Sequence, residues 1–167
     1  MSRPGTLPVE LGLRGAVVEL RQATIDDVAA IVRLLADDPL GRMRETASVD
    51  ADPEPYHRAF QAIDSDPDQL LLVVTDGVTV VATMQVTFIP GLSRRGALRA
   101  QIEAVRVAVS HRSAGLGAAM MGWVIEHARA RGCAVIQLTT DKSRADAHRF
   151  YQRLGFVASH EGMKLTL

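Results

Sequence analysis

A glycine-bearing junction, RSAGLGA over residues 112–118, separates an apolar stretch from a helical one. The preceding residues, Ala97 to Val109, are mostly apolar and have the length of a long strand. Beyond the glycines, apolar residues recur at helical spacing from Leu116 to Ala128, and Gly132 is placed to end that helix. A strand that passes through glycines into a helix leaves backbone N–H groups unpaired, and these groups favour an anion.

The rest of the chain alternates between strand and helix patterns, which predicts one mixed sheet with helices on its faces, an α/β (α+β) fold. The expected order is β-α-α-β-β-β-α-β-α-β-β. Residues 1–15 are expected to form a flexible arm, and residues 16–167 a single domain. The other predicted elements are a strand at Ala16–Gln22, a helix capped by Thr24, a helix at Tyr56–Ile63, a hairpin of Leu70–Val74 and Val78–Ile89, a strand at Ala134–Thr139, a helix capped by Ser143 with Asp146, and a terminal hairpin within Phe156–Leu167.

Composition excludes several classes of protein. The formal net charge of zero argues against a nucleic-acid binder, which must neutralise many phosphates. No apolar run approaches the roughly 18 residues of a membrane span, and the N-terminus lacks a signal-peptide core, so we expect a cytoplasmic protein. Cys133 is the only cysteine, which rules out an internal disulfide, and its apolar neighbours favour a buried structural thiol. The five histidines show no metal-binding spacing, so no metal is expected.

Two well-known phosphate-binding loops fit the junction poorly. A Walker loop needs a lysine and a hydroxyl residue after its second glycine, and neither follows Gly117. A dinucleotide-binding fingerprint needs glycine or alanine where Met120 stands, and it would follow the first strand of its fold. Asp141 imitates the ribose-binding acid of that fingerprint, so this alternative stays open, as does a plain helix N-terminus that binds nothing.

A third loop matches better. Arg112-Ser113-Ala114-Gly115-Leu116-Gly117 fits the Q/R-x-x-G-x-G/A loop of the GNAT superfamily of N-acetyltransferases. The stretch FYQRLGF, residues 150–156, resembles the tyrosine-containing final helix of that family and the Leu-Gly-Phe that ends it. The whole run from Ile102 to Lys164 is similar to small bacterial members. The resemblance implies a mostly antiparallel GNAT-type sheet, acetyl-CoA as the donor without a metal, and a homodimer.

The resemblance also places coenzyme A along this part of the chain. The pyrophosphate would lie on the loop and the first helical turn, where amides are unpaired. The pantetheine arm would pair with the backbone of the preceding strand, whose N–H groups are placed to steady the oxyanion. The implied acetyl-CoA contacts are Val107, Val109, Arg112, Ser113, Ala114, Gly115, Leu116, Gly117, Ala118 and Tyr151.

Two residues are candidates for proton transfer. Tyr151 stands at the position of the family's tyrosine and would protonate the leaving thiolate, although its apolar helix stripe also suits a core aromatic. Glu103 stands where many members of the family carry a glutamate that acts as a general base, directly or through water, and simple alternation puts it on the same face as Val107. The alternative for Glu103 is an ion pair with a nearby arginine, Arg99 or Arg106.

The predicted function is transfer of an acetyl group from acetyl-CoA to a primary amine of a small molecule, by direct attack in a ternary complex. The alternative is an acyl-CoA-binding sensor or structural module of the same fold without catalysis. From Asp26 to Asp68 the chain has eleven acidic residues against four arginines, a surplus that predicts attraction of cationic acceptors. Neither nucleic acid nor a membrane is an expected partner.

Overall fold

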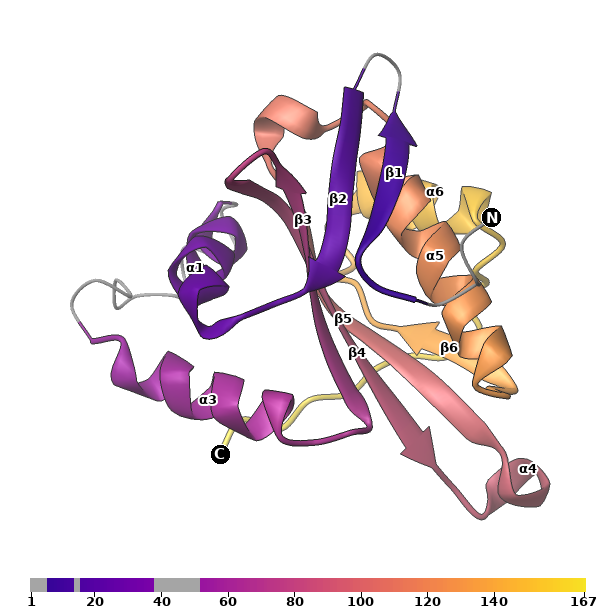
Figure 1. Cartoon of the computed structure of the whole chain (residues 1–167). Coiled ribbons are helices and arrows are strands. Elements are labelled where there is room, and N and C mark those ends of the chain that lie inside the picture. Colours follow the sequence, from indigo (N-terminus) through magenta and orange to yellow (C-terminus); the bar gives the residue numbers. More distant parts are fainter. Residues whose placement is uncertain (1–5, 14–15, 38–51) are drawn as a thin grey trace. The chain divides into compact units, whose positions relative to one another are not determined.

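A computed structural model describes residues 6–13, 16–37 and 52–167, which include a six-stranded sheet in the order β1-β2-β3-β4-β5-β6 (Figure 1). The chain divides into two compact units, Met1–Gln137 and Leu138–Leu167. The strands are β1 (Val9–Leu13), β2 (Ala16–Gln22), β3 (Gln69–Asp76), β4 (Thr79–Pro90), β5 (Leu98–Val107) and β6 (Val135–Leu138). The helices are α1 (Val28–Ala36), α3 (Glu54–Asp64), the short α4 (Ser93–Gly96), α5 (Leu116–Ala130) and α6 (Ala145–Arg153), with 3₁₀ turns at Ile25–Asp27 and Val109–His111.

The sheet is mixed and mostly antiparallel, which confirms the predicted fold class. Each of the first four strands pairs antiparallel with the next one along the chain. Strand β6 runs parallel to β5, because two contacts join the strands at the same offset in sequence: the Ala134 amide donates to Leu98 O (2.8 Å), and the Gln137 side chain donates to Gln101 (2.7 Å). Helix α5 supplies the crossover that parallel neighbours require.

Helices cover the two faces of the sheet in different places (Figure 1). On one face the ring of Phe88 in β4 meets His127 of α5 at 5.8 Å, and the Arg131 guanidinium lies 3.9 Å above it. On the other face α3 packs against β3, and α1 contacts β4 and β5. The buried apolar residues on this face form one core cluster, which consists of Ala23, Val28, Ile31, Val32, Phe60, Leu71 and Val73. The α5 face of β4 carries Ala82, Met84, Val86 and Phe88, all buried, and its opposite face carries Thr83, Gln85 and Thr87.

Two predictions about the ends of the chain are wrong. Val9–Leu13, expected within a flexible arm, forms β1, because its alternating side chains and its pairing with β2 add a strand at the sheet edge. The expected terminal hairpin is absent, since the structure assigns no strand to residues 156–167. Alternating Met163, Leu165 and Leu167 satisfy the pattern of a strand but stay exposed, because alternation alone supplies no partner strand.

The start of the last helix also differs from expectation. Ser143 was predicted to cap it, but α6 begins at Ala145 with Arg144 as its N-cap. The Ser143 hydroxyl donates instead to the carboxylate of Asp141 at 2.6 Å, and the Ser143 amide donates to the same oxygen at 2.9 Å. The Ser143 side chain is therefore used in a local turn around Asp141, and it does not cap the helix.

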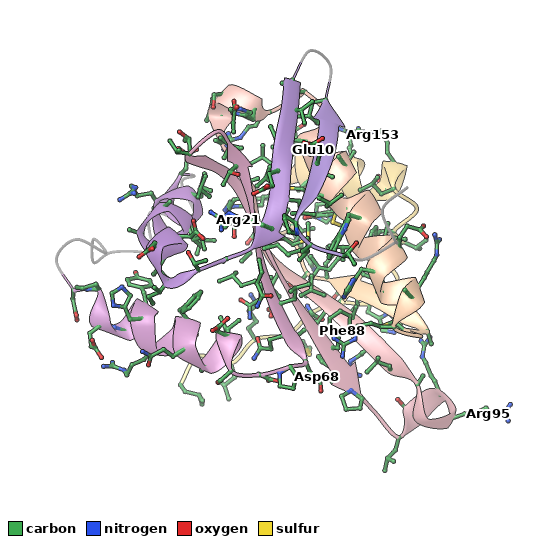
Figure 2. The ribbon with its side chains drawn as sticks, in the orientation of Figure 1. Glu10, Arg21, Asp68, Phe88, Arg95 and Arg153 are labelled. Carbon is green, nitrogen blue, oxygen red and sulfur yellow. The ribbon has the colours of Figure 1, made fainter. Side chains whose placement is uncertain are left out.

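A buried carboxylate fixes the entry into α1. Asp27 accepts two hydrogen bonds from Arg21 at 2.7 and 2.9 Å, and it accepts one from the Thr24 amide at 2.7 Å. Burial opposes ionisation of Asp27, but the hydrogen bonds from Arg21 and Thr24 outweigh that effect and hold its pKa below the ordinary value. Figure 2 shows Arg21 near the end of β2, where this pair joins the strand to the turn that precedes the helix.

Asp27→Asn should therefore destabilise the protein in a pH-dependent way. Because folding lowers the pKa of Asp27, its contribution is complete above the unfolded value of about 3.9 and is lost as the pH falls through the lower folded value. We expect a loss of about 1–3 kcal/mol at neutral pH, shrinking below about pH 4. Melting curves over this range test it, with the exposed neighbour variant Asp26→Asn as the control. A difference that did not change with pH would assign the effect to packing.

Candidate active site

The glycine junction has the predicted local structure. Strand β5 ends at Val107, a 3₁₀ turn follows, and α5 begins at Leu116 with Gly115 as its N-cap. Gly115 has φ +90°, a left-handed conformation that suits glycine, and a Cβ built there would meet no atom within 4 Å. The backbone angle, and not crowding by the protein, therefore favours glycine at this position.

The first turn of α5 presents unpaired amides. The first amide that bonds within it is that of Ala119, which donates to Gly115 O at 3.0 Å. Across the part of the chain that the structure describes, the amides of Leu116, Gly117 and Ala118 donate to no other residue, and no side chain caps them. Three free N–H groups at the positive end of a fifteen-residue helix suit an anion such as a pyrophosphate.

The segment before these amides is braced by the hairpin of β3 and β4. His111 Nε2 lies 3.2 Å from the Asp76 carboxylate at the turn of that hairpin, and the Ala108 amide donates to Val81 O at 2.8 Å. The loop therefore takes its position from two different points of the hairpin, and its approach to α5 is fixed by the sheet.

Arg112, the first residue of the loop motif, connects the loop to two other elements. Its Nε donates to Val107 O at 3.0 Å, and its Nη2 lies 3.3 Å from the carboxylate of Asp37, which follows α1. Sequence reasoning placed this charge at the mouth of the anion site but missed Asp37. No spacing rule links residues 75 positions apart, so the sequence held no signal for the pair.

Among the described residues, no strand pairs with the β6 side of β5 beyond residue 102, so this edge of β5 is open. The Ala108 amide points toward β4, and because a trans peptide sets C=O and N–H in opposite directions, Val107 C=O points away from β4. Gln137 lies opposite Gln101, and β6 ends one residue later, so the last five residues of β5 extend past its end. A pantetheine arm that pairs with a strand backbone needs an edge of this kind.

Val109 lies outside this edge. The predicted strand continued to Val109, but the structure ends β5 at Val107 and places Val109 in the 3₁₀ turn with 63% of its surface exposed. The turn forms because the His111 amide bonds back to Ala108 O at 2.9 Å, which bends the chain toward the loop. A strand-like partner at this edge would therefore pair with Val107 and the residues before it, and not with Val109.

A β-bulge in β5 corrects the predicted face of Glu103. Glu103 pairs with Gln85 and Arg106 pairs with Thr83, so two residues of β5 stand opposite one residue of β4. Ala104 takes the extra position with φ 54°. Glu103 and Arg106 consequently share the face of Gln85 and Thr83, whereas Val107, opposite Ala82, lies on the α5 face. The expectation that Glu103 and Val107 share a face is wrong, because simple alternation fails across a bulge.

Glu103 is available to a ligand. Its side chain is exposed, and within residues 6–13, 16–37 and 52–167 its carboxylate makes no hydrogen bond or ion pair. The predicted alternative, an ion pair with Arg99 or Arg106, is therefore not formed. Glu103 stands on the polar face of β5, directly beside the open edge.

Tyr151 belongs to the second unit, in α6. Its half-buried ring lies 5.1 Å from the ring of Phe150 and 5.8 Å from that of Phe156, so neighbouring aromatic residues hold it in place. Gly155, with φ +90°, ends this helix as the FYQRLGF pattern predicts. These contacts agree with a core aromatic and with a ring positioned for chemistry, so the catalytic role of Tyr151 stays a prediction.

Ion pairs neutralise part of the predicted acidic surface. Besides Asp27 and Asp37, Asp68 is paired, lying 2.8 Å from Arg131. Each pair reduces the negative field that an incoming cation would feel. The case for cationic acceptors, which depends on a formal surplus of acids, is correspondingly weaker.

Other features concern metals, membranes and the cysteine. Among the described residues, no three His, Cys, Asp or Glu side chains are grouped so as to hold a metal ion. Over the same residues, no helix is long and apolar enough to cross a membrane. Cys133 is half-buried and not fully buried as predicted, and this partial burial raises the pKa of its thiol, which suits a structural cysteine.

Comparison with known sequences decides the family. The sequence model of the acetyltransferase (GNAT) family matches residues 29–156, which include the loop and the FYQRLGF stretch. The chain belongs to the GNAT family. Aminoalkylphosphonate N-acetyltransferase of Salmonella typhimurium is 27% identical over 144 residues, 86% of this chain and 88% of the relative. Glucosamine 6-phosphate N-acetyltransferase of Trypanosoma brucei brucei is 33% identical over 88 residues, 53% of this chain and 58% of the relative.

Solved structures agree with the fold. A Bacillus halodurans C-125 protein described as a transcriptional regulator is 47% identical, with a TM-score of 0.86 over 90% of this chain and 99% of that one. Glucosamine-6-phosphate N-acetyltransferase of Arabidopsis thaliana has a TM-score of 0.74 at 23% identity, over 89% of this chain and 97% of that one. The GNAT fold is thus shared with acetyltransferases and with a protein described as a regulator.

The bulge predicts an unusual response to glycine. Ala104→Gly should leave stability unchanged or raise it by up to about 1 kcal/mol, because glycine relieves the left-handed strain of alanine. The matched control is Ala100→Gly in the same strand, which should lose about 1 kcal/mol or more, since Ala100 is fully buried. Thermal or denaturant unfolding measures both variants, and equal losses would contradict the bulge.

Proposed function

We propose that the protein is an acetyl-CoA-dependent N-acetyltransferase that acts on a primary amine of a small molecule, by direct attack in a ternary complex. The observation that carries the proposal is the continuity between the open edge of β5 and the free amides of α5. The edge suits a pantetheine arm, and the amides suit the pyrophosphate that follows this arm in coenzyme A.

Each proposed catalytic group has a separate task. Bound acetyl-CoA supplies the acetyl thioester. Glu103, exposed and unpaired, takes a proton from the ammonium group of the acceptor, directly or through one water, so that the neutral amine can attack the carbonyl carbon of the thioester. Val107 N–H, on the open edge of β5, donates to the acetyl oxygen as negative charge develops there. Tyr151 gives its proton to the leaving thiolate, as the match to the family's tyrosine suggests.

The relatives support a small acceptor. Aminoalkylphosphonate N-acetyltransferase and glucosamine 6-phosphate N-acetyltransferase are named for small molecules that carry an amine. We propose the same class of acceptor for this protein. We also propose that the remaining loop residues, Arg112, Ser113, Ala114 and Gly115, lie beside the pyrophosphate, and that the protein is a cytoplasmic homodimer.

The Bacillus halodurans relative favours a second candidate, an acyl-CoA-binding regulator without catalysis. The two candidates share the coenzyme A site and differ in turnover. The enzyme releases free thiol from acetyl-CoA in the presence of a suitable amine, whereas the regulator binds acetyl-CoA and releases none.

Calorimetry with acetyl-CoA and a thiol-release assay over a panel of amines test the proposal together. Gly117→Val should abolish acetyl-CoA binding and turnover while the protein stays folded, because a branched side chain would crowd the anion-binding amides. The matched control is Gly122→Val, a substitution further along the same helix at a position with no atom within 4 Å of the added Cβ. Unchanged affinity in Gly117→Val would contradict the loop assignment, and binding without thiol release for any amine would favour the regulator.

Two variants separate the proton-transfer roles. Tyr151→Phe keeps the ring packing and should lower kcat by roughly 100-fold at unchanged acetyl-CoA affinity, as for loss of a general acid. Glu103→Gln should lower kcat/KM at neutral pH, and its deficit should shrink as the pH rises and more acceptor arrives deprotonated. Rate profiles against pH measure both. A Glu103→Gln profile parallel to wild type would reject the base role, and full activity in Tyr151→Phe would leave that residue a core aromatic.

A further inference from the structure

We propose that the tip of the β4–β5 hairpin is a docking surface for a second copy of this chain. The docking knob consists of Leu92, Arg94 and Arg95, and it enters a hollow at the end of α3 in the partner copy. The inference rests on the homodimer of the proposed function, to which it gives a surface, and it depends on no step of the acetyl transfer.

The knob projects beyond the neighbouring strand. Gln69, the first residue of β3, pairs with Thr87, and β4 continues three residues further to Pro90. These residues carry the turn about 10 Å past the start of β3. Figure 2 shows the Arg95 side chain at the end of this projection, pointing away from the sheet. The knob can therefore reach another molecule without any rearrangement of the fold.

The knob combines an apolar side chain with charges that have no counter-charge nearby. Leu92 is 99% exposed. No acidic residue lies between Asp76 and Glu103, so the hairpin supplies no carboxylate of its own. Neither Arg94 nor Arg95 forms an ion pair or a hydrogen bond with any other residue that the structure describes. An exposed leucine beside two unpaired arginines favours a partner that offers both an apolar contact and carboxylates.

The backbone holds the arginines in a strained turn. Arg94 and Arg95 have φ 54° and 62°, and Gly96 follows with φ 78°. A left-handed backbone is costly for a residue with a Cβ, and two consecutive arginines bear that cost where glycine or asparagine would reduce it. Strain of this kind is typical of functional sites, which favours a binding role for the turn.

The complementary surface is a hollow where the end of α3, the start of β3 and α5 meet. It has a volume of about 330 Å³, and Leu7, Pro67 and Leu70 give it an apolar lining. Asp64 and Asp66 line the same hollow, and neither forms an ion pair with a described residue. This acidic hollow therefore offers the two kinds of contact that the knob lacks in its own chain.

The other groups at the acidic hollow leave this match intact. Arg131 also lines it but is neutralised by Asp68 at 2.8 Å, and His127 packs against aromatic rings. Asp64 and Asp66 accept hydrogen bonds only from neutral amide groups. Their charge is thus available to the arginines of another molecule. Because each chain has one knob and one hollow, two copies can exchange identical contacts about a twofold axis.

Sedimentation over a range of protein concentrations tests the apolar contact. Wild type should show a reversible monomer–dimer equilibrium, because two small contacts bury little surface. Leu92→Ser should raise the dissociation constant about 10-fold or more, the loss expected when an interface anchor is truncated. The matched control is Val78→Ser at the turn between β3 and β4, where the side chain is 100% exposed and should contribute nothing. Equal dissociation constants for the three proteins would reject the docking surface.

Reversal of charge tests whether the contact joins two molecules. The double variants Arg94→Glu/Arg95→Glu and Asp64→Lys/Asp66→Lys should each be monomeric, because knob and hollow then carry like charges. Mixed in equal amounts, they should form a heterodimer, since both contacts again join opposite charges. Melting curves check that each variant is folded. A mixture that stays monomeric overturns the proposal, as does a dimer that persists in either variant alone.

A thiol-release assay on the same proteins separates this proposal from the proposed function. If wild type is monomeric, the homodimer and the docking surface both fail, whatever its acetyl transfer. If wild type and Leu92→Ser are equally dimeric, only the docking surface fails. If the dimer responds to the variants as expected but no amine is acetylated, the docking surface stands and the proposed catalysis fails.

Discussion

The candidate site depends on backbone groups of β5 that do not pair with a neighbouring strand. Strand β5 extends past the end of β6, so the Val107 and Val105 carbonyls, which face away from β4, have no ladder partner among the residues that the structure describes. Unpaired carbonyls at a sheet edge require other donors. Arginine side chains supply them here, Arg112 to Val107 and Arg106 to Val105. A pantetheine arm that paired at this edge, as we propose, would exchange one set of hydrogen bonds for another, and only the difference between the two sets would contribute to affinity.

Arg112 also links the edge of β5 to another segment of the first unit. Its guanidinium also meets Asp37 at the end of α1, but both side chains are nearly half exposed, so the pair contributes at most about 1 kcal/mol. Such a contact orients the arginine more than it stabilises the fold. An anion bound on the first turn of α5 would compete with Asp37, which follows α1, for the positive charge of Arg112.

Local patterns were predictable from the sequence, and contacts between distant residues were not. The junction from β5 through Gly115 to α5 was predicted because glycine conformation and helical spacing are properties of adjacent residues. The bulge was missed because alanine is not a residue that normally marks a left-handed position, so Ala104 gave no warning. The link between Arg112 and Asp37 depends on how the sheet brings two segments together, which spacing does not report. The prediction of a terminal hairpin was wrong for the same reason, because alternating apolar residues form a strand only beside a partner strand.

The bulge in β5 keeps the charged side chain of Glu103 out of the apolar core beneath α5. In a regular β5, pairing that continued from Val107 opposite Ala82 would set Glu103 toward α5, among buried residues such as Met84 and Val86. A carboxylate there would lose its hydration without gaining a partner, which costs several kcal/mol or forces protonation. The extra residue at Ala104 turns Glu103 to the polar face while Val107 keeps its place on the α5 face. One strand can thus present apolar side chains to α5, backbone groups at its edge and a carboxylate on its polar face, which is the arrangement that the proposed donor and acceptor sites require.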